Sequence, residues 1–149
     1  MVLRAERGQA VVELALVLPV LVLLLLGLME FGRVLHALLT VQHAAREGAR
    51  LGITGATDAE IEARVRQAAG SLEGAGDPAR LDVDVQPPVP QRTVGEHLRV
   101  KVRYKFRFAI PWFATLFPAN CSDPSAPEGC RDPGDPDAYW FAVSLTMRI

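Results

Sequence analysis

The sequence predicts an α+β fold: a long N-terminal transmembrane helix that continues outside the membrane, a short second helix and a small antiparallel sheet of about three strands. Three observations support this prediction. One apolar run near the N-terminus is long enough to cross a bilayer. The stretch after it keeps the 3.6-residue spacing of an amphipathic helix. Three later segments alternate apolar and polar side chains, as half-buried strands do.

The transmembrane segment is predicted at residues 9–29. No charged or strongly polar side chain occurs from Leu14 to Met29, and the four residues before this run add only Glu13. Crossing a hydrocarbon core of about 30 Å takes about 20 apolar helical residues, so the run has the required length. Pro19 should introduce a mild kink, because proline removes one helical hydrogen bond.

Charges before the span predict its orientation. Arg4 and Arg7 precede it, opposed only by Glu6, and positively charged flanks tend to remain in the cytoplasm. Residues 1–8 are therefore expected to form a cytoplasmic leader. We expect a single-pass protein of the cytoplasmic membrane, with residues 30–149 on the extracytoplasmic side.

A cleaved secretory signal is the alternative, since it also combines basic residues with an apolar run. Two features oppose it. The apolar run is longer than the core of a usual signal peptide. The small residues that could mark a cleavage site, Ala44 and Ala45, also lie too far along the chain.

Cysteine usage agrees with an extracytoplasmic location. Cys121 and Cys130 bracket a short stretch that a disulfide could close. The alternative, a zinc site, would need two more ligands, and no histidine lies nearby in the sequence. A disulfide between the two cysteines is therefore the preferred interpretation, and such a small ring would add about 2–3 kcal/mol of stability.

Residues 30–52 are predicted to continue the helix outside the membrane. They contain no proline and keep helical spacing, and glycine then provides a natural stop. Within this stretch Ala44, Gly48 and Gly52 recur every four positions, a spacing that lets another backbone approach closely. This stripe could pack against the protein's own sheet or against neighbouring subunits in a helical bundle, and the sequence leaves both possibilities open.

Residues 53–149 are predicted to form a small α+β domain. Thr57 followed by Glu60 is the signature of a capping box, which predicts a second helix starting there. The sheet is predicted from three alternating segments: residues 81–85, 98–108 and 139–149. A sheet with one apolar face would be covered by the long helix.

The segment at 98–108 carries a basic side chain at every second position: Arg99, Lys101, Arg103, Lys105 and Arg107. Such a face could meet nucleic acid or another anionic surface. The alternative is a solvated face that Asp82 and Asp84 on the neighbouring strand partly neutralise. Because no aromatic side chain is interleaved on this face, we favour neutralisation and expect no nucleic-acid partner.

No catalytic motif is visible in the sequence. It has no glycine-rich phosphate loop, nucleophile elbow or zinc-binding HExxH helix. Two sets of side chains could in principle hold a metal: His36, His43 and Glu47 on one helix face, and Asp132, Asp135 and Asp137 in one loop. Ordinary interfacial polar packing explains the first set, and the second lacks the spacing of a calcium loop. We therefore expect no metal, no cofactor and no enzymatic activity.

A short basic leader, a glycine and then a carboxylate precede the long apolar run. If the chain were cut after Gly8, Gln9 would become the new N-terminus and Glu13 the fifth residue of a long apolar helix. This arrangement resembles a type IV prepilin processing site. A carboxylate within a membrane span is costly and is usually functional. Paired with the free amino group of a neighbouring subunit at about 4 Å, it would gain about 4 kcal/mol of attraction at an effective dielectric constant of 20.

Two segments then resemble the TadE-like proteins of tight-adherence, Flp-type type IV pilus systems: RGQAVVELALVLPVLVLLLLGLMEFGRV at 7–34 and AAREGARLG at 44–52. The C-terminal half is similar only loosely. The resemblance implies a minor pilin or pseudopilin matured by a prepilin peptidase. Its implied partners are other pilin-like subunits and the pilus assembly machinery. The alternative function is a signal-anchored binding module, an adhesin or a nucleic-acid-capturing subunit that uses the basic strand at 98–108.

Overall fold

The computed structural model describes residues 3–89, 91–93, 95–116, 129–132 and 134–148. The chain divides into two compact units, residues 1–33 and 34–149. Helix α1, Leu3–Gly52, contributes to both. It begins earlier than the expected start near Gln9, because the single glycine at position 8 does not interrupt the helix.

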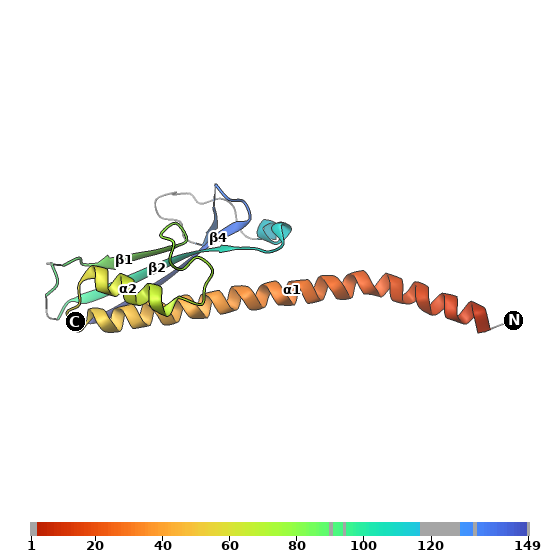
Figure 1. Cartoon of the computed structure of the whole chain (residues 1–149), viewed down its shortest axis with the longest axis horizontal. Helices are drawn as coiled ribbons and strands as arrows, with labels where there is room; N and C mark the ends of the chain where they lie inside the picture. Colours follow the sequence, from red (N-terminus) through yellow and green to blue (C-terminus); the bar gives the residue numbers. More distant parts are fainter. Residues whose placement is uncertain (1–2, 90, 94, 117–128, 133, 149) are drawn as a thin grey trace. The chain divides into compact units, whose positions relative to one another are not determined.

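The first unit consists of the N-terminal part of α1. This helix is long and apolar enough to cross a membrane, with a mean hydropathy of 2.9 over its apolar window and none of that window buried. Its large apolar side chains are open to the surroundings, as shown by Leu16 and Leu28, which are 72% and 75% exposed. Figure 1 shows a bend in this part of α1, and Pro19 is its expected cause. A contiguous apolar surface of this kind is suited to anchoring in a membrane.

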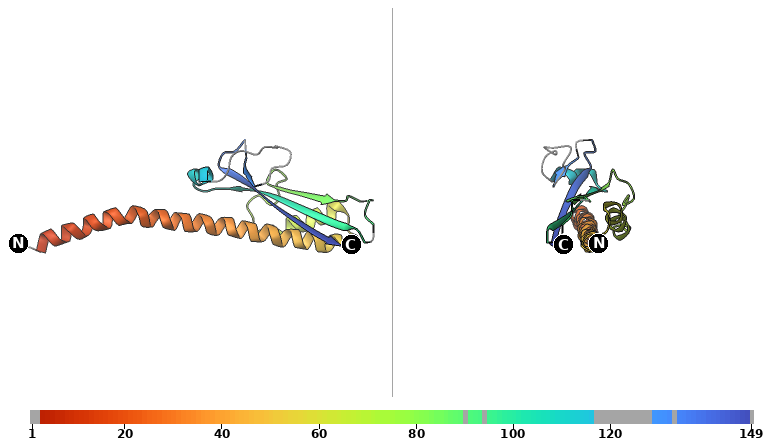
Figure 2. Two further views of the ribbon diagram at one scale, coloured as in Figure 1. Left: turned by 180° about the vertical axis from the view of Figure 1, so that it is seen from behind. Right: turned by 90° about the vertical axis from the view of Figure 1, so that its left-hand side faces the viewer.

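The second unit is a sheet with helices on one face. Residues 34–52 of α1 and helix α2, Asp58–Ala68, lie against the same side of the sheet (Figures 1 and 2). α2 starts with the predicted capping box. The Thr57 amide donates to Oε2 of Glu60 at 2.8 Å, while the Glu60 amide donates to the Thr57 hydroxyl at 3.4 Å. The hydrogen bond from the Thr57 amide lowers the pKa of Glu60.

The sheet has four antiparallel strands in the order β1-β2-β4-β3. Their bounds are Leu81–Gln86 for β1, His97–Arg107 for β2, Cys130–Arg131 for β3 and Ala138–Arg148 for β4. The predicted α+β class and the three predicted strands are confirmed, with ends shifted by one residue. β3 was not predicted, because two residues carry no measurable alternation. A short 3₁₀ helix, η1 at Pro111–Leu116, follows β2.

The core lies between the sheet and the two helices. β2 supplies its centre, since the apolar side chains on one face of the strand are all buried: Leu98, Val100, Val102, Tyr104 and Phe106. Opposite them, α2 buries Ile61 and Val65, and α1 buries Val41. Each such side chain contributes about 1.5–3 kcal/mol when it is removed from water. The C-terminal part of α1 is therefore an integral part of this domain.

Candidate functional site

The three residues singled out at the N-terminus lie on two neighbouring turns of α1. Gly8, Gln9 and Glu13 are all exposed, and a Cβ atom added to Gly8 would meet nothing within 4 Å. Nε2 of Gln9 donates to Oε1 of Glu13 at 3.1 Å. Among the side chains that the structure describes, Glu13 has no other hydrogen-bond partner and no ion-pair partner.

This geometry leaves Glu13 able to accept further hydrogen bonds. An ionised carboxylate has about four acceptor positions, and the Gln9 amide uses one. A cationic donor from outside the chain could use the others and offset the cost of placing the charge in an apolar stretch. Glycine in a helix interior also costs about 0.5–1 kcal/mol relative to alanine, so α1 is locally weak at Gly8.

The stripe of small residues on α1 packs against helix α2 and strand β2 of the same domain. A Cβ atom on Gly48 would overlap Cγ2 of Val65 and lie 3.4 Å from Cγ2 of Ile61, both on α2. A Cβ atom on Gly52 would overlap Cδ2 of Leu98 on β2. Ala44 is fully buried. Of the two partners that the sequence left open for this stripe, the structure places the chain's own sheet and second helix against it.

The basic face of β2 is balanced by carboxylates from two directions. Arg103 forms an ion pair with Asp82, its cross-strand neighbour on β1. Nζ of Lys105 lies 2.9 Å from Oδ2 of Asp132, and Arg107 lies 3.8 Å from Asp135. At least three of the five positive charges on this face are therefore neutralised within the domain.

Asp132 joins the end of the sheet to the loop that follows β3. Its Oδ2 accepts from Nε1 of Trp140 at 2.8 Å, and its Oδ1 accepts from the Gly134 amide at 2.7 Å. Burial alone would raise the pKa of Asp132, but the hydrogen bonds from Lys105, Trp140 and Gly134 outweigh it and lower the pKa. Sequence reasoning missed this arrangement. The only sign of these hydrogen bonds in the sequence was the presence of both a basic strand and an aspartate-rich loop.

Neither set of candidate metal ligands forms a cluster. The carboxylate of Glu47 binds Arg64 at 2.7 Å, and this hydrogen bond lowers the pKa of Glu47. Asp132 is occupied by the donors given above. Within the described part of the chain, no group of three His, Cys, Asp or Glu side chains could hold a metal ion.

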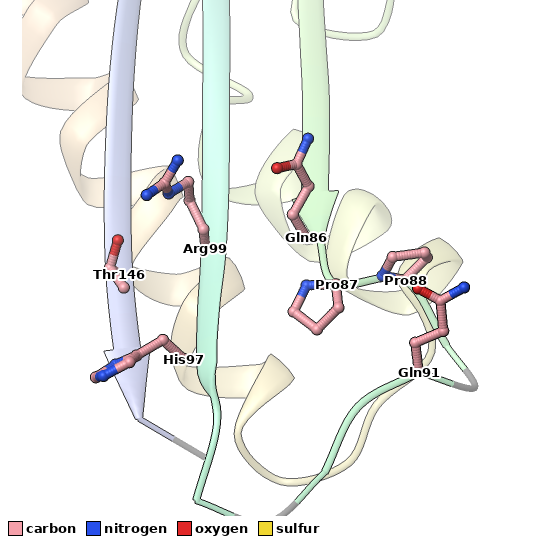
Figure 3. Close-up of a pocket in the computed structure, with 7 residues that line it drawn as sticks. All are labelled: Gln86, Pro87, Pro88, Gln91, His97, Arg99 and Thr146. Atoms are coloured by element: carbon pink, nitrogen blue, oxygen red, sulfur yellow. The ribbon is translucent and has the colours of Figure 1, made fainter.

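A depression of about 450 Å³ lies on the outer face of the sheet, near the end where β2 begins (Figure 3). Gln86, Arg99 and Thr146 form a row across three neighbouring strands. The other lining residues are Pro87, Pro88, Gln91 and His97. The lining contains the guanidinium of Arg99 and the imidazole of His97 but no carboxylate.

The predicted disulfide involves a residue outside the described part of the chain, because Cys121 lies within 117–128. Cys130 is described. It opens β3, is nearly buried and pairs with Trp140 in the ladder to β4. The bridge between the two cysteines stays a prediction.

The comparison with protein families confirms the resemblance found in the N-terminal region. A family model described as TadE-like protein matches residues 8–50. The match begins at Gly8, includes Glu13 and the whole apolar run, and ends within the stripe of small residues. No curated protein and no solved structure matches the chain significantly.

Proposed function

We propose that this chain is a minor pilin or pseudopilin, a structural component in the assembly of a tight-adherence, Flp-type type IV pilus. The observation that best supports this proposal is the TadE-like match over residues 8–50, which starts at the glycine of the suspected processing site. This segment lies within one uninterrupted helix, and the part of it before residue 34 has an apolar surface suited to a membrane. The role is structural, with no catalytic activity and no cofactor.

In this proposal residues 9–29 span the cytoplasmic membrane once. The basic leader stays in the cytoplasm, and the domain formed by residues 34–149 folds on the other side. A prepilin peptidase removes residues 1–8. The remaining chain then associates with other pilin-like subunits and with the assembly machinery.

Processing requires α1 to open locally. The peptide bond between Gly8 and Gln9 lies inside the helix, whereas peptidases generally act on extended backbone. The low helix propensity of glycine makes this turn less costly to unwind than a turn without glycine. Because Gly8 has free space around its Cα, the enzyme can also approach the bond closely.

Cleavage would create the partner that Glu13 lacks. The new amino group of Gln9 is a cation, and that of a neighbouring subunit can reach the acceptor positions that the Gln9 side chain leaves unused. At about 4 Å the attraction is about 4 kcal/mol at an effective dielectric constant of 20. An unpaired Glu13 would oppose packing in lipid, so pairing favours one axial register between subunits.

The first experiment is mass spectrometry of the protein extracted from membranes. We expect Gln9 as the first residue. An intact Met1 terminus would contradict processing, and a terminus near Ala45 would indicate a secretory signal peptide instead.

The second experiment compares Glu13→Gln with the wild type. The amide has the same size and inserts into lipid more easily, so a mere anchor would tolerate the change. We expect normal cleavage at Gly8 but reduced pilus abundance, measured together with the level of processed protein. Glu6→Gln, in the leader, is the matched control. Normal piliation of the Glu13→Gln strain would refute the pairing role.

A further inference from the structure

The edge of β4 is covered for only a small part of its length. On one side β4 pairs with β2 from Ala138 to Arg148. On the other side β3 reaches only Tyr139 and Trp140. From Phe141 onward, this second side has no strand beside it in the described part of the chain, and β4 borders the sheet there (Figure 2).

The backbone groups on this free edge can be identified. The carbonyls of Ala138 and Trp140 accept from the amides of Asp132 and Gly129 at 3.0 Å each, so they point towards β3. The N–H and C=O groups of every second residue point the same way along a regular strand, and the register of β4 with β2 has no bulge. The free edge therefore presents the N–H and C=O groups of four residues: Ala142, Ser144, Thr146 and, at the end of the strand, Arg148.

Before Arg148, the last residue of β4, nothing in the sequence of this edge protects it. Proteins usually block exposed edges with charged side chains, proline, a bulge or very short strands. From Ala138 to Met147, β4 contains no charge and no proline. The opposite border of the sheet, β1, carries Asp82 and Asp84 and is followed by Pro87.

The side chains along the free edge define what can cover it. Val143, Leu145 and Met147 point towards the helices and are only partly buried. The outward-facing Ser144 and Thr146 are small, uncharged and exposed. A charged side chain beside the apolar Leu145 would lose part of its contact with water, which is unfavourable. The fitting occupant is an uncharged extended segment with apolar side chains at alternate positions.

We propose that the β4 edge from Ala142 to Thr146 binds an extended, uncharged segment of a partner polypeptide by strand addition. β3 already adds to this edge, so the partner strand continues the same ladder and starts where β3 ends. Backbone hydrogen bonds supply the attraction, and the alternate apolar side chains supply the selectivity. The proposal stands independently of the pilus role, since it rests on the sheet alone.

Photo-crosslinking in cells that produce the full chain tests this proposal. A photoreactive amino acid replaces Thr146 on the edge or, as the matched control, Arg99. The two residues are cross-strand neighbours on the same face, but Arg99 lies one strand further in, about 4.8 Å from the edge strand. We expect a crosslink from position 146 but not from 99. Mass spectrometry should map it to an uncharged alternating segment of another protein.

Ser144→Pro shows whether the crosslink depends on backbone pairing. Proline removes an N–H that faces the free edge and leaves the bonds to β2 intact, as edge strands permit. The crosslink should be lost in Ser144→Pro and kept in Ser144→Ala, which retains the N–H. Slow hydrogen exchange of the Val143 amide confirms that the variant is folded. If the proline variant fails to fold, Ser144→Lys replaces it, because a charged edge opposes pairing.

Three outcomes would overturn the proposal. The first is equal crosslinking from positions 146 and 99. The second is a crosslink that persists in folded Ser144→Pro. The third is a crosslink that joins β4 to β4 of a second copy, which would assign the edge to self-association instead.

Discussion

Gly48→Ala is the most direct test of how α1 packs into the domain. The added methyl group would overlap Cγ2 of Val65 and lie 3.4 Å from Ile61 and 3.6 Å from Val100. Val65 cannot turn away easily, because a β-branched side chain in a helix strongly prefers one χ1 rotamer. The helices must therefore move apart.

Two opposing contributions set the magnitude. Replacing glycine by alanine inside a helix gains about 1 kcal/mol of helix propensity. Overpacking a filled core costs about 1–3 kcal/mol, and the upper part of this range applies because the neighbour is stiff. We expect a net loss of about 1–2 kcal/mol. Gly52→Ala should cost less, because its methyl group would meet the flexible end of Leu98.

Thermal unfolding of the full chain in detergent, followed by near-UV circular dichroism, measures the effect. For a domain the size of residues 34–149, each kcal/mol lowers Tm by about 4 °C. The matched control is Gly32→Ala in the same helix, where an added Cβ meets nothing within 4 Å. We expect no loss for this control. The double variant Gly48→Ala, Val65→Ala should lose less stability than the sum of the single losses. A Gly48→Ala protein as stable as the control would refute the close approach.

Three further predictions concern the folded domain. Thr57→Ala should lower the free energy of unfolding by about 1 kcal/mol in urea titrations, since the amide of Glu60 loses its acceptor; an unchanged midpoint would contradict this. The lowered pKa of Asp132 means that its ionised form stabilises the fold at neutral pH and that this contribution is lost as pH falls through the folded-state pKa. Asp132→Asn should therefore lower Tm at pH 7 by more than at about pH 3, and a pH-independent difference would argue against this. Non-reducing peptide mapping should find Cys121 joined to Cys130, and two free thiols would exclude the bridge.

Elements with a long periodic pattern could be predicted from sequence. β2 alternates without a fault over its whole length, so both its existence and its buried face were clear. The capping box at Thr57 placed the start of α2, because the residues that form it are close in sequence. Local patterns of this kind need no knowledge of the rest of the fold.

The missed features depend on contacts between distant residues. β3 is two residues long, and its place beside β4 depends on Gly129, which has a φ of 60°, and on the hydroxyl of Tyr139 that donates to the Gly129 carbonyl. The hydrogen bonds of Asp132 join a loop to β2 and β4. The stripe at Gly48 was recognised, but a spacing of four residues cannot say which backbone approaches it.

The continuity of α1 has a mechanical consequence. One helix runs from Leu3 to Gly52 without an intervening flexible linker, and its last turns supply Val41 and Gly48 to the core. A pull on the N-terminal end is therefore transmitted along helical hydrogen bonds directly to the contacts with α2 and β2. Pulling these last turns of α1 away would remove the side chains that they contribute to the core, so tension along the helix would act directly on the stability of the domain.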